Sequence, residues 1–487
     1  MNNKLKMFFQ TTLGKLFLAI LFGLVLYVSI GKNFLIAPIL IFFCSIFYSK
    51  RIYILAAVTV FGWFFFDSLF NFIRLNLKEN QVNLFHAVLK YQNIVIENKM
   101  LCTKIATIIV LFSLFCILYF YSFFQKKVNP TMYLLIITAV TICTTLFFHQ
   151  QSWPAVYALT LSCCLMKFIW FLAYYLTDAG SVKKYPLEAI LSIEPIWIFN
   201  FHRVHAVPRG SRELTASEQI DVVNLSKCQI SGIKLALVSM IFKLTAQLLE
   251  QFIFNSQGSS VIFNYIQVSS LNLVNPNLIG LAKYNQLDIS LFQLWSVVLV
   301  KPFIYFLFEP IGNAGLLIAF LRLLGFKVGR NFYRPHQATT FSNFLHRVYF
   351  YYSNVLIHFF YLPIFIYLSE LNFRSKLKIF MGTFLTISVG GFVMSYFRNN
   401  ILLIELGASN LLHLTLLKMP YLFIIAFFAA VSNIAHSSIK LSQYLRVGFF
   451  YFLYCVAFSM QGYLVTDSFA DIVHFFLKLS TLGYYAS

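Results

Sequence analysis

The residues best suited to chemistry lie in the stretch "ATTFSNFLHRVYFYY" (residues 338–352), where His346 and Arg347 stand inside an aromatic run. Histidine exchanges protons near neutral pH, and arginine holds anionic groups. Such side chains are costly in an apolar chain, so their presence requires a reason. We weigh three interpretations: a catalytic segment, a helix end at a membrane surface, and the remnant of a catalytic site.

Few other ionisable or polar side chains fall within apolar runs. They are Asp67, Lys234, Lys243, Glu250, Glu309, His358, Ser395 and His413. They include neither the series of carboxylates expected of a proton relay nor the regular arginines of a voltage sensor. No group of His, Cys, Asp and Glu has the spacing of metal ligands, so we expect no metal and no bound cofactor. Most of the eight cysteines lie in apolar runs and are expected to be small buried hydrophobes.

The composition places these residues in a multi-pass membrane protein. The chain has 487 residues, of which 60% are hydrophobic and only 11% charged, whereas soluble domains average about 25% charged residues. The net charge of +21 comes from basic residues that stand singly or in pairs between apolar runs. This pattern is typical of topology signals at an anionic membrane surface, and we expect no nucleic-acid partner.

The apolar runs predict an all-α bundle of ten to twelve transmembrane helices. The runs are 13–31, 33–49, 52–73, 101–124, 131–149, 153–177, 229–254, 288–309, 349–369, 376–397, 411–435 and 446–466. The pair Glu309-Pro310 predicts a helix end, with 310–324 as a re-entrant piece. Segment 74–100 reads as an amphipathic surface helix. The run 13–31 is not followed by a small-residue cleavage site, so we expect it to remain as a span.

Two polar islands interrupt the runs, the first island at 178–228 and the second island at 325–348. They divide the chain into N-terminal helices (1–177), the first island, and a core bundle (229–487) with a signature segment at 325–363. The basic residues that flank the first six runs fall mainly on the face that carries the N-terminus, which predicts a cytoplasmic N-terminus. Both islands then share the cytoplasmic face.

The second island resembles the signature region of the membrane-bound O-acyltransferase family. In that family a Gly-Phe pair and an Asn-x-x-x-Pro lead into a Ser/Thr-Phe-x-x-Phe-Trp-x-Arg-Trp-(Asn/His) stretch. The matching positions are Gly325, Phe326, Asn331, Pro335, Thr340, Phe341, Phe344 and Arg347. In the first island, "VPRGSREL" and the following "NLSKCQISGIKLAL" resemble segments of a bacterial branch, so that the likeness covers roughly 178–400.

The resemblance implies a membrane-embedded enzyme that moves an acyl group from a thioester, such as acyl-CoA, to a hydroxyl of a cell-envelope saccharide or lipid. It implies the cytoplasmic membrane of a bacterium, with membrane lipids as partners and another membrane protein as a further candidate partner. Donor binding would fall to Arg347, His346, Asn331 and Arg334.

The chain departs from the family at both catalytic landmarks. The two tryptophans are missing, and the Asn/His position is Tyr349. The position of the family's histidine is matched best by Ser395 or Tyr396, since no histidine occurs between His358 and His413. Acyl transfer to a hydroxyl needs a base, and serine cannot accept the proton unaided. An active enzyme must therefore recruit His413 or, in second place, His358. His346 ranks third, because Arg347 beside it suggests an exposed helix mouth.

Two other functions stay open from the sequence. One is a catalytically degenerate member that binds a lipid, an acyl donor or a protein partner in the same cavity. The other is a transporter of an envelope lipid, which the number of helices permits. If close relatives carry a histidine at the position of Ser395, its absence here would indicate that this chain alone has lost the activity.

Overall fold

The computed structural model describes residues 7–30, 36–65, 216–254, 291–398, 418–435 and 442–459, with a few isolated positions between them. Within these residues the chain is helical, and the only β pairing is one bridge between Glu218 and Phe326. Five helices are long and apolar enough to cross a membrane, or six if one bent pair forms a single span. The protein is therefore helical with the features of a multi-pass membrane protein.

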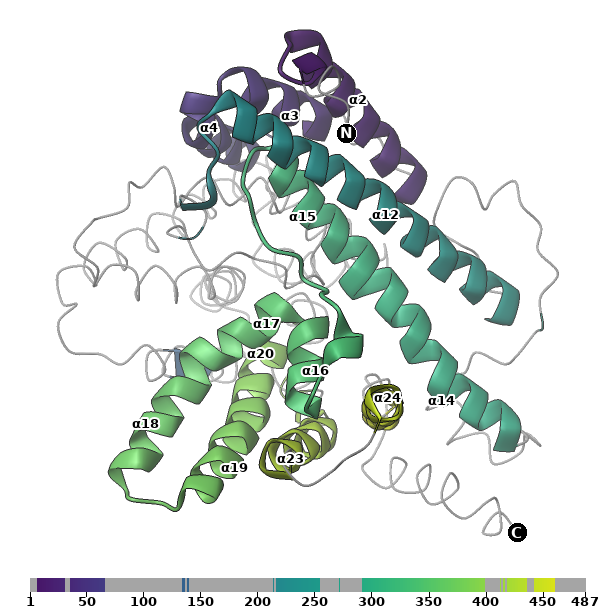
Figure 1. The fold of residues 1–487 in the computed structure, drawn as a ribbon, viewed down its shortest axis with the longest axis vertical. Coiled ribbons are helices and arrows are strands. Elements are labelled where there is room, and N and C mark those ends of the chain that lie inside the picture. The colour runs from purple at the N-terminus through teal and green to yellow at the C-terminus, as the bar shows by residue number, and fades with distance from the viewer. Residues whose placement is uncertain are drawn as a thin grey trace, which may run out of the picture.

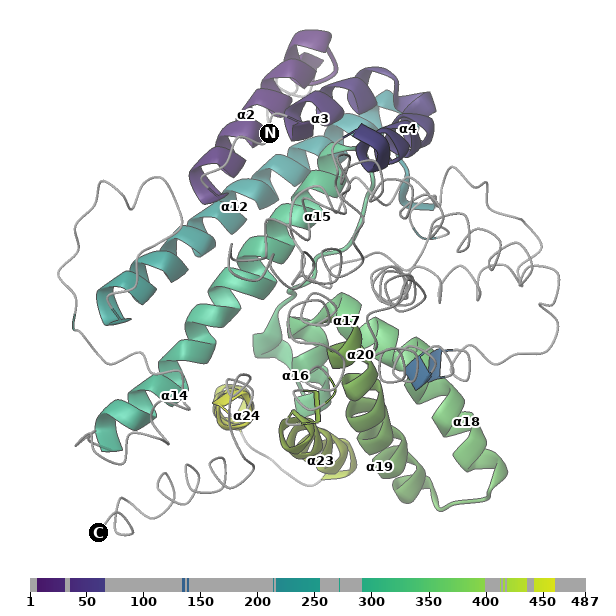
Figure 2. The same cartoon turned by 180° about the vertical axis from the view of Figure 1, so that it is seen from behind.

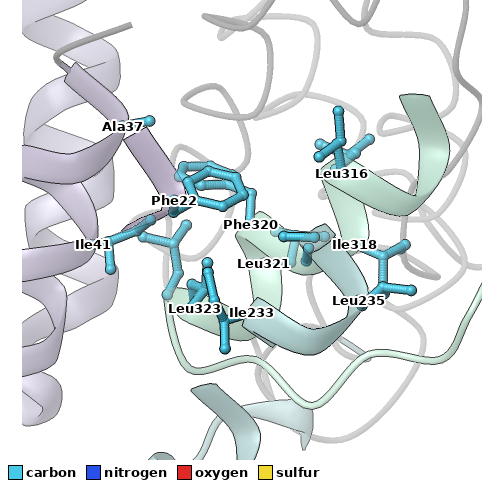
Figure 3. Packing of buried hydrophobic residues seen from close by; sticks show 14 of the residues in the cluster. Phe22, Ala37, Ile41, Ile233, Leu235, Leu316, Ile318, Phe320, Leu321 and Leu323 are labelled. Carbon is cyan, nitrogen blue, oxygen red and sulfur yellow. The ribbon is translucent and has the colours of Figure 1, made fainter. Parts of the chain in front are cut away.

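The first group of helices surrounds α12. It comprises α2 (Thr12–Ile30), α3 (Ile36–Ile46), the short η1 (Tyr48–Lys50), α4 (Arg51–Phe65), α12 (Val222–Phe254) and α15 (Ala314–Leu323). In both views α2, α3 and α4 lie at one end of the molecule, with α12 between them and α15 (Figures 1 and 2). Figure 3 shows Phe22 of α2 stacked on Phe320 of α15, with ring centroids 6.0 Å apart.

Small residues bring α12 close to the helix that it crosses. A Cβ at Gly232 would lie 3.0 Å from the carbonyl oxygen of Ala319, and one at Gly315 would overlap the Ser239 hydroxyl. Apolar lipid tails give little hydrophobic drive for helix association, so close van der Waals packing of small residues takes its place. This packing aligns α12 and α15 in antiparallel directions.

Two oppositely oriented charge pairs accompany this packing. Lys243 of α12 interacts electrostatically with Glu309, and Glu250 of α12 with Lys301. The lysine of one pair and the carboxylate of the other both come from α12, so each of these four groups has an opposite charge near it on the facing helix. Charged groups buried in a membrane bundle are expected to pair in this way.

The prediction of a helix end at Glu309-Pro310 is wrong. One continuous helix runs through α14 (Leu291–Phe306), the π-helical η5 (Leu307–Asn313) and α15, and it includes the candidate span Val298–Leu323. Proline lacks the N–H for the helical hydrogen bond and its ring clashes with the preceding turn. The wider π turn accommodates Pro310, so the predicted runs 288–309 and 310–324 form one helix.

The predicted runs 33–49 and 52–73 do not form two separate straight spans in the described residues. The segments Ala37–Ile46 and Tyr48–Val58 are bent by 107° at a short break. Helix α3 has 11 residues and is therefore about 16 Å long, against about 30 Å for a hydrocarbon core. These two helices form one broken span or a re-entrant pair. The predicted runs 101–124, 131–149 and 153–177 and the segment 74–100 lie outside the described residues, apart from four isolated positions in 131–149.

Arg51 joins the two polar islands. Its buried guanidinium donates to the carbonyl oxygens of Gln219 (3.2 Å) and Gly325 (3.3 Å) and pairs with the Glu218 carboxylate at 3.4 Å. Burial raises the pKa of Glu218, while the charge of Arg51 opposes that shift. Backbone bonds complete the junction, since Gln219 N donates to Gly325 O at 2.9 Å. Gly325 has a φ of +100°, which favours glycine.

The second group of helices carries the signature segment. It comprises the short η6 (Pro335–Gln337), α16 (Phe341–Val348), α17 (Phe350–Leu356), the π-helical η7 (Ile357–Tyr361), α18 (Leu362–Glu370), α19 (Ser375–Leu385), the π-helical η8 (Thr386–Gly390), α20 (Gly391–Arg398), α23 (Met419–Ala435) and α24 (Gln443–Ser459). In both views it lies across the α14–α15 helix from α2–α4 (Figures 1 and 2).

Candidate functional site

A cavity of about 310 Å³ lies within the second group of helices and is closed on one side by the α14–α15 helix. Its lining comes from α14, η5, α15, α16, α17, η7, α19, η8, α20, α23, α24 and the loop before α16. Pockets of this size that combine apolar walls with a few polar groups are the usual places for small-molecule binding. We therefore take this cavity as the candidate site.

All three π-helical segments in the described part of the chain contribute to the cavity wall. Glu309 and Pro310 come from η5, Ile357 and Tyr361 from η7, and Thr386 with its neighbour Ile387 from η8. A π turn inserts an extra residue into an α-helix and re-aims the side chains around it, which is why such turns are frequent at functional sites. Their meeting at one cavity marks this region independently of any sequence motif.

The segment 338–352 forms a short helix that ends at the cavity. Asn343 N donates to the Thr340 hydroxyl at 3.0 Å, which caps the start of α16. At Tyr349 the backbone leaves the helical conformation (φ −126°, ψ 62°), so α16 ends and α17 begins. His346 of α16 and Tyr349, which directly follows that helix, both line the cavity.

Arg347 lies away from the cavity. Its side chain donates to Asn343 Oδ1 at 2.8 Å and to the carbonyl oxygen of Arg334 at 3.3 Å, and it is not among the lining residues. Arg334 is exposed, with its guanidinium 5.3 Å from the Tyr333 ring centroid. Both arginines therefore belong to the surface of the second island, beside the cavity.

Asn331 connects the second island to the cavity wall. It is buried, lines the cavity, and accepts from the backbone N–H of Tyr351 through its side chain (3.3 Å) and from that of Phe350 through its carbonyl (3.1 Å). These bonds fasten the loop to the first turn of α17. Asn331 thus positions the loop as well as facing the candidate site.

Tyr349 makes a hydroxyl–hydroxyl hydrogen bond of 2.6 Å with Tyr454 of α24. Tyr454 is buried and stacks on Phe306, with ring centroids 4.6 Å apart. Tyr349, at the Asn/His position of the motif, is thus hydrogen-bonded to α24. No sequence motif relates this helix to Tyr349.

Glu309 is the acidic residue among the described lining of the cavity. It is 6% exposed, and its Oε2 accepts from Asn313 Nδ2 at 2.9 Å, whereas its Oε1 accepts no hydrogen bond from any described residue. The described lining contains no lysine or arginine, although the whole chain carries +21. The cavity is therefore more acidic than the chain around it.

The remaining predicted residues fall in different places. Ser395 of α20 lines the cavity together with Tyr349, whereas Arg347, which the resemblance also placed at the site, does not. His358 in η7 is exposed and is not among the lining residues, although its neighbour Ile357 is. His413 lies outside the described residues. Among the histidines that the structure describes, His346 is the one at the cavity, half-buried with its ring 5.3 Å from that of Phe350.

Sequence reasoning missed two features of the site. Glu309 stood out as a charge within an apolar run, but the predicted helix end placed it at a surface. Tyr454 carried no signal, because one tyrosine among 28 in an aromatic-rich chain is unremarkable in sequence. In the described part of the chain no three His, Cys, Asp or Glu side chains gather as a metal site would require.

Comparison with protein-family models and with curated proteins finds no match to this chain.

Proposed function

We propose that the protein is a membrane-embedded O-acyltransferase whose reaction takes place in this cavity. One observation supports it most: residues from the segment that resembles the acyltransferase signature (Asn331, His346, Tyr349) and Ser395 from a later helix line the same cavity. In the sequence, only the resemblance links Ser395 to the second island. A shared cavity is what two landmarks of one active site require.

His346 is the residue best placed to act as the base. As the acceptor hydroxyl attacks the thioester carbonyl, its proton passes to the imidazole and the new C–O bond forms. When the tetrahedral intermediate collapses, the C–S bond breaks, and the imidazolium returns the proton to the leaving thiolate. The products are an ester and a free thiol, and the histidine is regenerated.

The second island offers a place for the acyl donor. Lys327, Arg330 and Arg334 are exposed on the loop that leads to Asn331 and the cavity. Arginine and lysine suit phosphate groups such as those of coenzyme A. In this proposal the donor's charged part lies on the loop, and its thioester reaches the cavity beside His346.

A transfer assay on single variants tests the proposal. Membranes containing the protein would be incubated with radiolabelled acetyl-CoA, and base-labile label in envelope lipid and saccharide would be measured. We expect His346→Ala to lower transfer by about 10²–10⁴-fold, since a positioned base contributes that much. His358→Ala is the matched control, because this histidine is exposed and outside the cavity lining, and it should keep full activity.

Full transfer by His346→Ala at normal protein levels would remove this histidine from the mechanism. Absence of transfer by the parent protein with every acceptor preparation would argue for the binding alternative, in which the cavity holds a ligand without reaction. That alternative draws on the tie between the Tyr349 and Tyr454 hydroxyls and on serine at position 395 in place of a histidine.

A further inference from the structure

Glu309 gives the cavity a feature that acyl transfer does not use. The carboxylate is buried within a candidate span, and one of its oxygens lacks a hydrogen bond from any described residue. A buried carboxylate of this kind is costly unless its oxygens are paired. Glu309 is a lining residue of the cavity, so its side chain lies beside the space that a ligand would fill.

A basic side chain of the facing helix lies near Glu309. Lys243 interacts with it electrostatically from α12 and offsets part of the cost of burying its charge. Lys243 is not among the lining residues, and its Nζ lies 5.0 Å from the centre of the Phe308 ring. The lysine therefore provides a counter-charge without itself lining the cavity.

The rest of the wall favours an organic cation. Six tyrosines line the cavity: Tyr305, Tyr349, Tyr352, Tyr361, Tyr421 and Tyr454. The electron-rich faces of aromatic rings attract ammonium groups, and a site that joins aromatic walls to one carboxylate suits such a group. A metal ion would need several ligating side chains, and no such group is present among the described residues.

We infer that the cavity recognises a ligand carrying an organic ammonium group, with Glu309 as its anionic partner. On the proposed function, on which this part of the inference rests, the ligand is the acyl acceptor and therefore also carries a hydroxyl, so that its class is that of the amino alcohols. The ammonium group binds at Glu309, and the hydroxyl is presented to His346. The amino alcohol is either a soluble molecule or the headgroup of a lipid.

Binding to the unaltered protein provides the first test. The protein in nanodiscs of phosphatidylglycerol, which has no ammonium group, would be titrated with choline and with 3,3-dimethylbutan-1-ol, the uncharged molecule of the same shape. Ethanolamine and ethylene glycol form a second pair. We expect each cation to bind about tenfold or more tightly than its neutral partner, because the carboxylate and the aromatic walls attract a desolvated cation by about that much. Equal binding within both pairs would overturn the inference.

Two variants assign the preference to its residue. Glu309→Gln should abolish the difference between choline and its neutral partner. Glu250→Gln is the matched control, because Glu250 is also a partly buried carboxylate facing a lysine of α14, but it is not among the lining residues. It should retain the preference. Retention of the preference by Glu309→Gln would place the ammonium group elsewhere and contradict the assignment.

A change of nanodisc lipid shows whether the ammonium group belongs to a lipid headgroup or to a soluble molecule. If it is a headgroup, phosphatidylethanolamine nanodiscs should raise the Tm of the parent protein, but not that of Glu309→Gln, above the value in phosphatidylglycerol. If it is soluble, only the added amines should raise the Tm. No response to either source would overturn the inference. None of these measurements requires turnover, so their failure is distinct from failure of the acyltransferase proposal.

Discussion

At the scale of single residues, the cavity shows how a polar group is kept in an apolar bundle. Tyr349 stands where the resembling motif has asparagine or histidine, and its hydroxyl is bonded to that of Tyr454 rather than left facing lipid. An unpaired buried hydroxyl costs free energy, so the two tyrosines stabilise each other's position. The same pair fixes the break between α16 and α17, and hence the position of His346.

A double-mutant cycle measures this pair. Tyr349→Phe and Tyr454→Phe should each lower the free energy of unfolding in detergent by about 1–3 kcal/mol, because each leaves one hydroxyl without its partner. The double variant should lose much less than the sum of the two, since no unpaired hydroxyl remains. Strict additivity of the two effects would show that the hydroxyls do not interact in the folded protein.

At the scale of elements, the sequence predicted the presence of the helices better than their ends. Apolar runs locate α2, α12, the α17–α18 helix and the α19–α20 helix, because length and hydropathy are local properties. The π turns are set by how helices pack, and periodicity does not report them. Pro310 therefore suggested a helix end where the structure has a widened turn.

The candidate site, too, was predictable from the sequence only in part. Tyr349 and Ser395 were expected together only because a family resemblance placed them so, and Glu309 was suspected only because charge is rare in an apolar run. The convergence of η5, η7 and η8 on one cavity depends on contacts between distant segments, which no single stretch of sequence contains.

The contact between η7 and η8 provides a prediction about one glycine. A Cβ at Gly390 would lie 2.7 Å from Leu356 Cδ2 and 3.0 Å from the Phe360 ring. We expect Gly390→Ala to lower the free energy of unfolding by about 1–3 kcal/mol through overpacking. A shift of these helices would also reduce binding in the cavity that they line.

Gly448→Ala is the matched control. Gly448 also lies within a helix, α24, but a Cβ there meets nothing within 4 Å. Alanine should stabilise that helix slightly, since it forms helix better than glycine does. Thermal unfolding of both variants gives the comparison, and equal effects of the two substitutions would contradict the close packing of η7 on η8.

At the scale of the whole molecule, contacts gather several distant segments at one end of α12. Ser226 donates to the carbonyl oxygen of Phe9, which places the start of α2 there, and Arg51 joins residues 218–219 of the first island to Gly325 of the second. The N-terminal segment and both islands therefore meet at the same end of the bundle. Which side of the membrane this end faces is a separate prediction, based on its basic residues.

Cysteine labelling tests that orientation. Ala216 and Gln337 are exposed, one in each island, and Lys376 is exposed beyond the candidate span Phe350–Glu370 that follows the second island. With the islands in the cytoplasm, an impermeant maleimide should label Lys376→Cys in intact spheroplasts. It should label Ala216→Cys and Gln337→Cys only after the membrane is permeabilised. The parent protein, whose described cysteines are buried, gives the background.

The two island positions must respond alike, because Arg51 and the backbone pairing between Gln219 and Gly325 hold the islands together. Early labelling of both would reverse the orientation and move the basic loop beside the cavity to the outer face. A coenzyme A thioester from the cytoplasm would then be unable to reach that loop, and the donor would have to be a lipid-borne acyl group. Early labelling of only one island position would contradict a shared face for the two islands.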